Sequence, residues 1–383
     1  MIVTGIIVEY NPFHNGHSYH IQQARALTKC DLLIAIMSPT FMQRGEPALL
    51  NKFIRTEVAL NNGVDMVIEL PSYYAIQSAN YFAQGALKLL NELKINYLVF
   101  GMESDNLAEL KKAAQISLIP SYQEDVALLI KKGLRYANAC NEAFKQYGIT
   151  NIEYANDILA LAYLQEIYQN NYQIEAVSLK RTNNYLSKDL SSDIVSATAI
   201  RAALIKNIDI SKYTKMNEEI KTYDNELVFF NDFFNILKYK IISMSISDLQ
   251  SIHGMVEGIE YKIKNSILKV NNINELILTL SSKRYPQTRI QRLLVYIICH
   301  ITKQEIASID IDYLRILGMN IKGQAYLKVI KNQTNYKMVT TYSNHKNNGL
   351  DLELRISQIY SLASLHTNYL AFKEYQQAVI IKK

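Results

Sequence analysis

Residues 2–20, IVTGIIVEYNPFHNGHSYH, decide the fold. The run 2–8 is apolar and rich in β-branched residues, which predicts a buried strand. Asn11-Pro12 ends that run, and the helical spacing of apolar residues over 21–28 predicts a helix that begins near the histidines. A buried strand followed at once by a helix is typical of the first unit of an α/β sheet.

The same alternation continues downstream. Near-continuous apolar runs predict further buried strands at 32–38, 64–71, 95–100 and 173–181, and periodic segments predict helices at 51–62, 77–93, within 107–170 and from 196. Strands that are apolar throughout are typical of a parallel sheet covered on both faces. The fold class that we predict is therefore α/β, with a Rossmann-like parallel sheet connected by right-handed crossovers.

The second half of the chain has a different pattern. Beyond residue 205 it contains one proline, Pro286, few glycines and long Ile/Leu-rich periodic segments, which predict a mainly α-helical C-terminal domain. A chain of 383 residues is also long for a single core. We therefore predict two domains, residues 1–205 and residues 206–383.

Composition excludes several classes of protein. With 49% hydrophobic and 20% charged residues the chain is typical of a globular protein, and no apolar run is long enough to span a bilayer. The N-terminus lacks the basic segment of a signal peptide. The three widely spaced cysteines indicate neither a disulfide framework nor a structural zinc site. We therefore expect a cytoplasmic protein without a membrane partner.

Charge is divided unevenly between the halves. Residues 1–205 carry 17 Lys and Arg against 19 Asp and Glu, whereas residues 206–383 carry 24 against 16. A basic second half indicates that a polyanion would bind there. The alternative, that these charges are scattered over solvated helix faces, is equally compatible with the charge count.

The histidines of HNGH form the first candidate site. His14 and His17 are three residues apart at the start of the predicted helix, and ligands of parallel sheets bind beyond the carboxyl ends of the strands. Gly16 lets a ligand approach the backbone, and the helix N-terminus attracts phosphate. We therefore predict that His14 and His17 donate to one phosphoryl oxyanion. The two histidines could instead bind a metal, but no third ligand follows at suitable spacing, so we expect no resident metal. The other alternative is that they are surface residues of a capped helix.

A second candidate site lies at 196–201, SATAIR. Its hydroxyls, on Ser196 and Thr198, can cap a helix and donate to phosphates, and Arg201 can supply charge to a leaving pyrophosphate. An ordinary capped helix could have the same sequence, so SATAIR indicates a phosphate site only in combination with HNGH.

Two basic segments are candidates for binding RNA. One follows the second strand and contains Arg44, Lys52 and Arg55; the other combines an aromatic residue with the bases Lys283, Arg284, Arg289 and Arg292. Basic residues beside an aromatic suit phosphate binding and base stacking. A solvated helix edge or structural ion pairs would explain these residues as well.

The order of motifs adds a resemblance. HNGH resembles the HxGH motif of the nucleotidyltransferase superfamily. The strings GIIVEYNPFHNGHSYHI (5–21), VDMVIELPSYYAIQSANYFAQGAL (64–87), FGMES (100–104) and SATAIR occur in the order seen in the bacterial tRNA(Met) cytidine acetate ligase family. SSKRYPQTRIQRLLVYII (281–298) and YLRILGMNIKGQAYLK (313–328) extend the resemblance into the second half.

The resemblance implies a two-step reaction in which ATP activates acetate as acetyl-adenylate, with release of pyrophosphate, and the acetyl group passes to N4 of the wobble cytidine of elongator tRNA(Met). It implies ATP with Mg²⁺ as cofactor, acetate as co-substrate and no obligate protein partner. The ATP contacts that it implies are Ile7, Val8, Glu9, Tyr10, Asn11, Pro12, Phe13, His14, Asn15, Gly16, His17, Ser18, Tyr19, His20, Gly101, Asn156 and Arg181.

Two other functions are compatible with the motifs. One is an adenylyltransferase that acts on a small-molecule acceptor, and the other is an RNA-binding protein without catalytic activity. The basic second half disfavours the first, and the presence of both HNGH and SATAIR disfavours the second. No base for the acetyl-transfer step is evident from the sequence.

Overall fold

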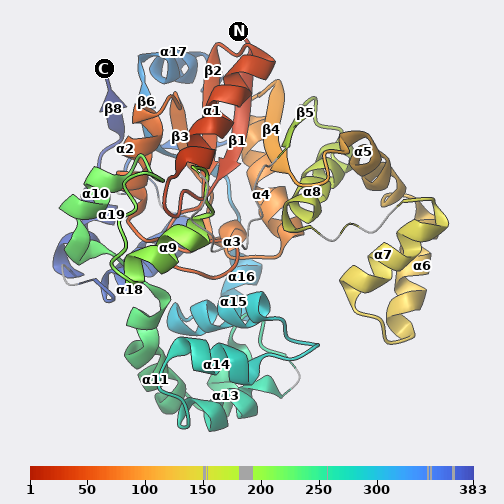
Figure 1. Cartoon of the computed structure of the whole chain (residues 1–383), viewed down its shortest axis with the longest axis vertical. Coiled ribbons are helices and arrows are strands. Elements are labelled where there is room, and N and C mark those ends of the chain that lie inside the picture. The colour runs from red at the N-terminus through yellow and green to blue at the C-terminus, as the bar shows by residue number, and fades with distance from the viewer. Residues whose placement is uncertain are drawn as a thin grey trace.

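The computed structural model describes residues 1–149, 152, 154–180, 193–256, 258–342, 345, 347–364 and 367–383. Its centre is an eight-stranded sheet in the order β5-β4-β1-β2-β3-β6-β7, with β8 paired to β6 (Figure 1). The strands are β1 (Val3–Val8), β2 (Leu32–Met37), β3 (Met66–Glu69), β4 (Tyr97–Met102), β5 (Glu175–Lys180), β6 (Tyr313–Asn320), β7 (Lys337–Val339) and β8 (Ile380–Lys382). β1 to β5 pair in parallel, which confirms the predicted sheet.

Helices connect and cover these strands. Those of the first part of the chain are α1 (Asn15–Thr28), α2 (Lys52–Asn61), α3 (Ser72–Ala75), α4 (Ala79–Glu92), α5 (Leu107–Ile116), α6 (Pro120–Lys131), α7 (Tyr136–Gln146), α8 (Ala155–Gln169), α9 (Ala197–Ile205) and α10 (Asn217–Thr222). The second part contributes the 3-10 helices η1 (Asp224–Glu226) and η2 (Phe230–Phe233) and the helices α11 (Phe234–Ser243), α12 (Ile246–Ser251), α13 (Ile259–Ile267), α14 (Ile273–Leu280), α15 (Gln287–Ile298), α16 (Lys303–Ser308), α17 (Ile321–Ile330), α18 (Asn348–Ser361) and α19 (Thr367–Gln376).

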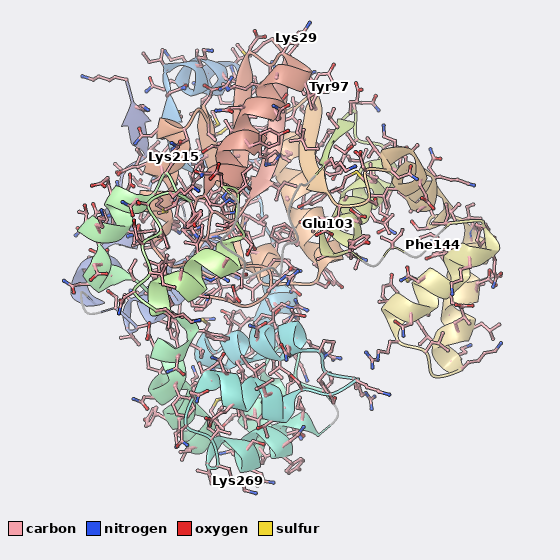
Figure 2. All side chains as sticks on the ribbon, viewed as in Figure 1. Lys29, Tyr97, Glu103, Phe144, Lys215 and Lys269 are labelled. Carbon is pink, nitrogen blue, oxygen red and sulfur yellow. The ribbon has the colours of Figure 1, made fainter. Side chains whose placement is uncertain are left out.

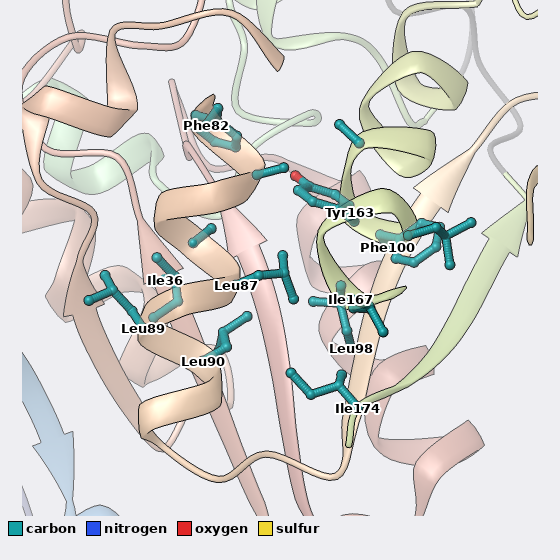
Figure 3. Packing of buried hydrophobic residues seen from close by; sticks show 14 of the residues in the cluster. Ile36, Phe82, Leu87, Leu89, Leu90, Leu98, Phe100, Tyr163, Ile167 and Ile174 are labelled. Atoms are coloured by element: carbon teal, nitrogen blue, oxygen red, sulfur yellow. The ribbon is translucent and has the colours of Figure 1, made fainter. Parts of the chain in front are cut away.

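Both faces of the sheet are buried, as the uninterrupted apolar strands predict. Alternate residues of β2 enter two different cores: Leu32, Ile34 and Ile36 join one, and Leu33, Ala35 and Met37 join the other. Figure 3 shows the first of these cores, in which Leu87 of α4 and Ile167 of α8 pack with Leu98 of β4.

A third core lies in the lobe formed by α11 to α16, at the lower end of the molecule in Figure 1. It includes Phe41 and Met42 from the loop after β2, so the helical lobe packs directly on that loop. Tyr360 of α18 joins the same core, and its hydroxyl donates to the Ala48 carbonyl at 2.6 Å. Lys269 in this lobe and Lys29 at the end of α1 lie at opposite ends of the long axis (Figure 2).

The second half of the chain is mainly helical, as predicted, but it also returns to the sheet. β6 pairs antiparallel with β3, and β7 and β8 pair in parallel with β6. The sheet therefore crosses the division that we predicted at residue 205. The physical reason is that β3 would otherwise end the sheet with unpaired backbone groups, which β6 satisfies. Within the described part of the chain, no helix is both long and apolar enough to cross a bilayer.

Candidate active site

A pocket of about 620 Å³ opens at the carboxyl ends of β1 and β4. Ile7, Val8 and Glu9 contribute one wall from the end of β1, and Phe100 and Gly101 contribute another from β4. β1 pairs with β2 on one side and with β4 on the other. The order of strands along the sheet reverses at this point, which is where open α/β sheets bind ligands.

His14 and His17 lie together in this pocket at the start of α1. Their rings stack with centroids 3.8 Å apart and planes inclined by 27°. The Gly16 N–H donates to Nδ1 of His14 at 3.0 Å, and the His14 N–H donates to Nδ1 of His17 at 3.2 Å. A neutral imidazole that accepts at Nδ1 carries its proton on Nε2. Each ring therefore has an Nε2–H donor, beside the N-terminus of a helix, as an oxyanion requires.

Aromatic side chains form an apolar wall that the sequence analysis did not identify. Phe82 of α4, Phe100 of β4 and Tyr163 of α8 line the pocket. Figure 3 labels all three side chains. The Phe100 and Tyr163 ring centroids are 5.7 Å apart. Because each residue comes from a different element, only the tertiary fold brings the three together. Such a wall suits a planar heteroaromatic base.

Two further predicted contacts line the same pocket. Gly101 and Asn156 both line the pocket, and the Asn156 side-chain amide donates to Oε1 of Glu103 at 2.9 Å. Lys180, at the end of β5, also lines the pocket and pairs with Asp105 at 3.2 Å. Arg181 lies outside the described residues.

The predicted contact segment 7–20 divides into two groups. The residues that line the pocket are Ile7, Val8, Glu9, His14, Gly16, His17, Tyr19 and His20. The residues that do not line it are Tyr10, Asn11, Pro12, Phe13, Asn15 and Ser18. Tyr10 and Phe13 are buried in the sheet core, and Asn15 donates to two backbone carbonyls at 2.9 Å. This second group shapes the turn rather than the pocket surface.

The start of the SATAIR segment lies at the pocket, and its residues differ in their contacts. Ser196 lines the pocket and caps α9 by accepting from the Ala199 N–H at 3.1 Å. Thr198 does not line the pocket. Arg201 donates to the Asn11 carbonyl at 2.6 Å and forms an ion pair with Glu46. Its guanidinium is thus engaged by protein groups, and Arg201 is not among the residues that line the pocket. A contact between Arg201 and pyrophosphate stays a prediction.

The prediction that Lys52 and Arg55 bind RNA is wrong. The Lys52 side chain is 3% exposed and its ammonium lies between Glu69 and Glu374, at 2.5 and 2.7 Å. Arg55 is fully buried and donates to the Glu9 carbonyl at 2.7 Å and to the Ser38 carbonyl at 2.9 Å. Both side chains stabilise the interior and cannot contact a macromolecule.

The other basic residues remain candidates. Arg44 and Arg292 line the pocket, and Arg292 Nη1 donates to the Gln43 carbonyl at 3.3 Å. Lys283 and Arg284 are exposed in the turn before α15. Arg289, in the first turn of that helix, lies over the Tyr285 ring at 4.7 Å. The basic run therefore extends from the pocket onto the surface of the helical lobe.

Among the described residues that line the pocket, Glu9 is the one that carries a carboxylate. Burial raises its pKa above the usual range, and the nearby carboxylate of Glu46 acts in the same direction. The Gln43 N–H, which donates to Oε1 of Glu9 at 2.7 Å, opposes the shift, as do the positive charges of Arg44 and Arg201. Within the described residues, no group of three or more His, Cys, Asp or Glu side chains could hold a metal ion.

Comparison with known proteins identifies clear relatives. The family model described as HIGH Nucleotidyl Transferase matches residues 1–375. A protein of Anoxybacillus flavithermus named tRNA(Met) cytidine acetate ligase is 36% identical over 378 residues, which cover 94% of each chain. A protein of Bacillus subtilis with the same name is 36% identical over 385 residues, covering 94% of this chain and 92% of the other.

Solved structures agree with the fold. The crystal structure of Thermotoga maritima TmcAL (apo, form I) superposes with a TM-score of 0.91 at 27% identity and covers 100% of both chains. The crystal structure of the same protein bound with alpha-thio ATP (form II) gives a TM-score of 0.88 at 28% identity, again with full coverage of both chains.

Proposed function

Since the chain belongs to the HIGH nucleotidyltransferase family and, within it, to the tRNA(Met) cytidine acetate ligases, we propose that it activates acetate with ATP and acetylates N4 of the wobble cytidine of elongator tRNA(Met). The observation that carries the proposal is the stacked pair of His14 and His17 in a pocket at the ends of β1 and β4. The ATP analogue bound by a relative of the same fold supports ATP as the nucleotide.

The first step needs positioning rather than a base. Acetate is already ionised near pH 7, so it can attack the α-phosphate without losing a proton. The protein must hold two anions together and stabilise the charge that develops on phosphorus. The Nε2–H groups of His14 and His17 suit that task, with adenine against Phe82, Phe100 and Tyr163.

The assignment of Arg201 changes with its contacts. Because its guanidinium holds the Asn11 carbonyl and Glu46, we assign it a positioning role for the turn that carries the histidines. Mg²⁺ would accompany the ATP phosphates, since it is commonly bound by substrate phosphates, one or two carboxylates and several waters. It would neutralise phosphate charge when bound.

The second step brings RNA to the same pocket. The basic residues at its rim and on the adjoining turn, Arg44, Lys283, Arg284, Arg289 and Arg292, suit the phosphates of an RNA loop. We accordingly assign acetate activation to residues 1–205 and tRNA binding to the helical lobe within residues 206–383. Because the proposed substrates are ATP and tRNA, we expect the reaction to take place in the cytoplasm.

The test combines two assays. Purified protein with ATP and radiolabelled acetate should acetylate unmodified elongator tRNA(Met) and leave other tRNAs unlabelled. His14→Ala and His17→Ala should each lower acetate-dependent exchange of pyrophosphate into ATP by about 10² or more, the usual cost of losing an oxyanion donor. His300→Asn, at an exposed position in the helical lobe, is the matched control. Acetate-dependent exchange without acetylation of any tRNA would favour a small-molecule acceptor instead.

A further inference from the structure

Glu9 is a carboxylate in a pocket otherwise suited to anions. It lines the same cavity as His14 and His17. Acetate and a triphosphate would both repel an ionised carboxylate placed beside them, and the repulsion grows as water is excluded. A carboxylate at this point is favourable with a cation or with a ligand group that carries N–H or O–H.

The surrounding structure holds Glu9 in place. Its carbonyl accepts from the buried guanidinium of Arg55 at 2.7 Å, which fixes the backbone at the end of β1. Its Oε1 accepts from the Gln43 N–H at 2.7 Å. Among the described residues, none donates a hydrogen bond to Oε2. The side chain is thus oriented through one oxygen, and the other remains for a ligand.

The loop that orients Glu9 also contacts the helix that begins the basic surface. The Gln43 carbonyl accepts from Arg292 of α15, and Arg292 and Thr288 of that helix line the pocket. Gly45 packs so closely that an added Cβ would lie 2.5 Å from the Arg292 backbone nitrogen. Glu9 is therefore joined through this loop to the side of the pocket from which we propose that RNA enters.

We infer that Glu9 accepts a hydrogen bond from the exocyclic amine of the target cytidine and takes its proton when the acetyl group is transferred. The inference rests on the proposed function. A Glu or Asp carboxylate recognises cytosine by accepting a hydrogen bond from its exocyclic amine, N4. In the step itself, N4 attacks the acetyl carbonyl carbon and forms the C–N bond. The bond between the acetyl carbonyl carbon and the bridging phosphate oxygen breaks, and AMP leaves with that electron pair. The N4 proton passes to Glu9 and then to water.

The electrostatic surroundings support this role. Burial and Glu46 raise the pKa of Glu9, whereas Gln43, Arg44 and Arg201 lower it, and the net direction is upward. The buried hydroxyl of Tyr163 faces it from α8. A carboxylate with a raised pKa is a stronger base than a solvated one.

The experiment separates the two steps. Acetyl transfer is measured in single turnovers from synthetic acetyl-adenylate to elongator tRNA(Met), and adenylate formation is measured as acetate-dependent exchange of pyrophosphate into ATP without tRNA. Glu9→Gln should lower the transfer rate by about 10² or more, as for the loss of a general base. The transfer rate should fall at least about tenfold more than the exchange rate. The rate of transfer by the wild type should rise with pH and level off, and the Gln variant should lose that rise.

Two further variants make the outcome decisive. Glu166→Gln makes the same change in a half-buried carboxyl of α8 that does not line the pocket, and it should leave both rates unchanged. Glu9→Asp keeps the carboxylate and should keep the pH dependence at a lower rate, which is readable even where the Gln variant fails to fold. Equal losses in both assays would assign Glu9 to ATP or Mg²⁺ binding and overturn the inference, as would an unchanged transfer rate. Absence of transfer by the wild type would instead contradict the proposed function.

Discussion

Lys52→Met should destabilise the protein strongly and leave no specific defect in tRNA binding. The Lys52 ammonium lies between two carboxylates that are 2 to 3% exposed, Glu69 of β3 and Glu374 of α19. Burial lowers its pKa, but Glu374 and Glu69 together raise it more, so the side chain remains charged. The substitution leaves both carboxylates buried, with Arg315 at 3.5 Å from Glu374 as the nearest remaining cation.

The magnitude follows from these contacts. Removing one partner of a buried ion pair costs about 3–5 kcal/mol, and Lys52 serves two partners, so we expect the upper part of that range. At a urea m-value of about 3 kcal/mol/M this corresponds to a midpoint lower by about 1.3–1.7 M. Urea unfolding followed by circular dichroism measures the shift. Lys112→Met, at an exposed lysine of α5, should change stability by less than about 0.5 kcal/mol.

A double variant tests the cause of the loss. Lys52→Met combined with Glu69→Gln removes one of the stranded charges and should recover part of the lost stability, because the two residues are in contact. The reasoning fails if Lys52→Met costs less than about 1 kcal/mol while weakening tRNA binding. That result would restore Lys52 to the RNA surface.

Three further changes test other parts of the structure. Gly16→Ala places a Cβ 2.8 Å from Cε1 of His14, so the ring must turn away, and pyrophosphate exchange should fall by about 10² with unchanged thermal stability; unchanged exchange would contradict the site. Lys283→Glu with Arg284→Glu should reduce the slope of log affinity against log salt for tRNA by about 1.5, measured by filter binding from low to high salt; an unchanged slope would place RNA elsewhere. Burial lowers the pKa of His253, so the unfolded chain binds a proton more readily than the folded one. Stability should therefore fall as pH drops below about 6.5, and the urea midpoint of His253→Gln should fall less between pH 7.5 and 5.5.

The fold of the first half could be predicted because each of its elements has a local signature. β1 to β4 are mainly apolar, and the helices between them show a clear period, so burial on both faces is evident from the sequence. The sequence around β6 does not show this alternation of apolar strands and periodic helices. β6 lies about 250 residues from its partner β3 in sequence, and it contains the charged Arg315, whose buried position depends on Glu374.

Local spacing alone predicts the part of the candidate site that one short segment builds. His14 and His17 cap α1 by local hydrogen bonds, so their proximity follows from their spacing. The aromatic wall comes from separate elements that only the fold brings together. Lys52 and Arg55 show that local spacing does not predict what a helix face contacts. Their spacing predicts a shared helix face, but not that this face lies against buried carboxylates and carbonyls.

The pairing of β3 with β6 has a consequence for synthesis of the chain. Ile68 pairs with Ile316, so about 250 residues must be added after β3 before its partner exists. At about 5–20 residues per second, a ribosome needs roughly 12 to 50 s to make them. During that interval the nascent β3 presents an open edge of the kind that invites intermolecular strand pairing. β6 thus shields the edge of a strand that was made about 250 residues earlier.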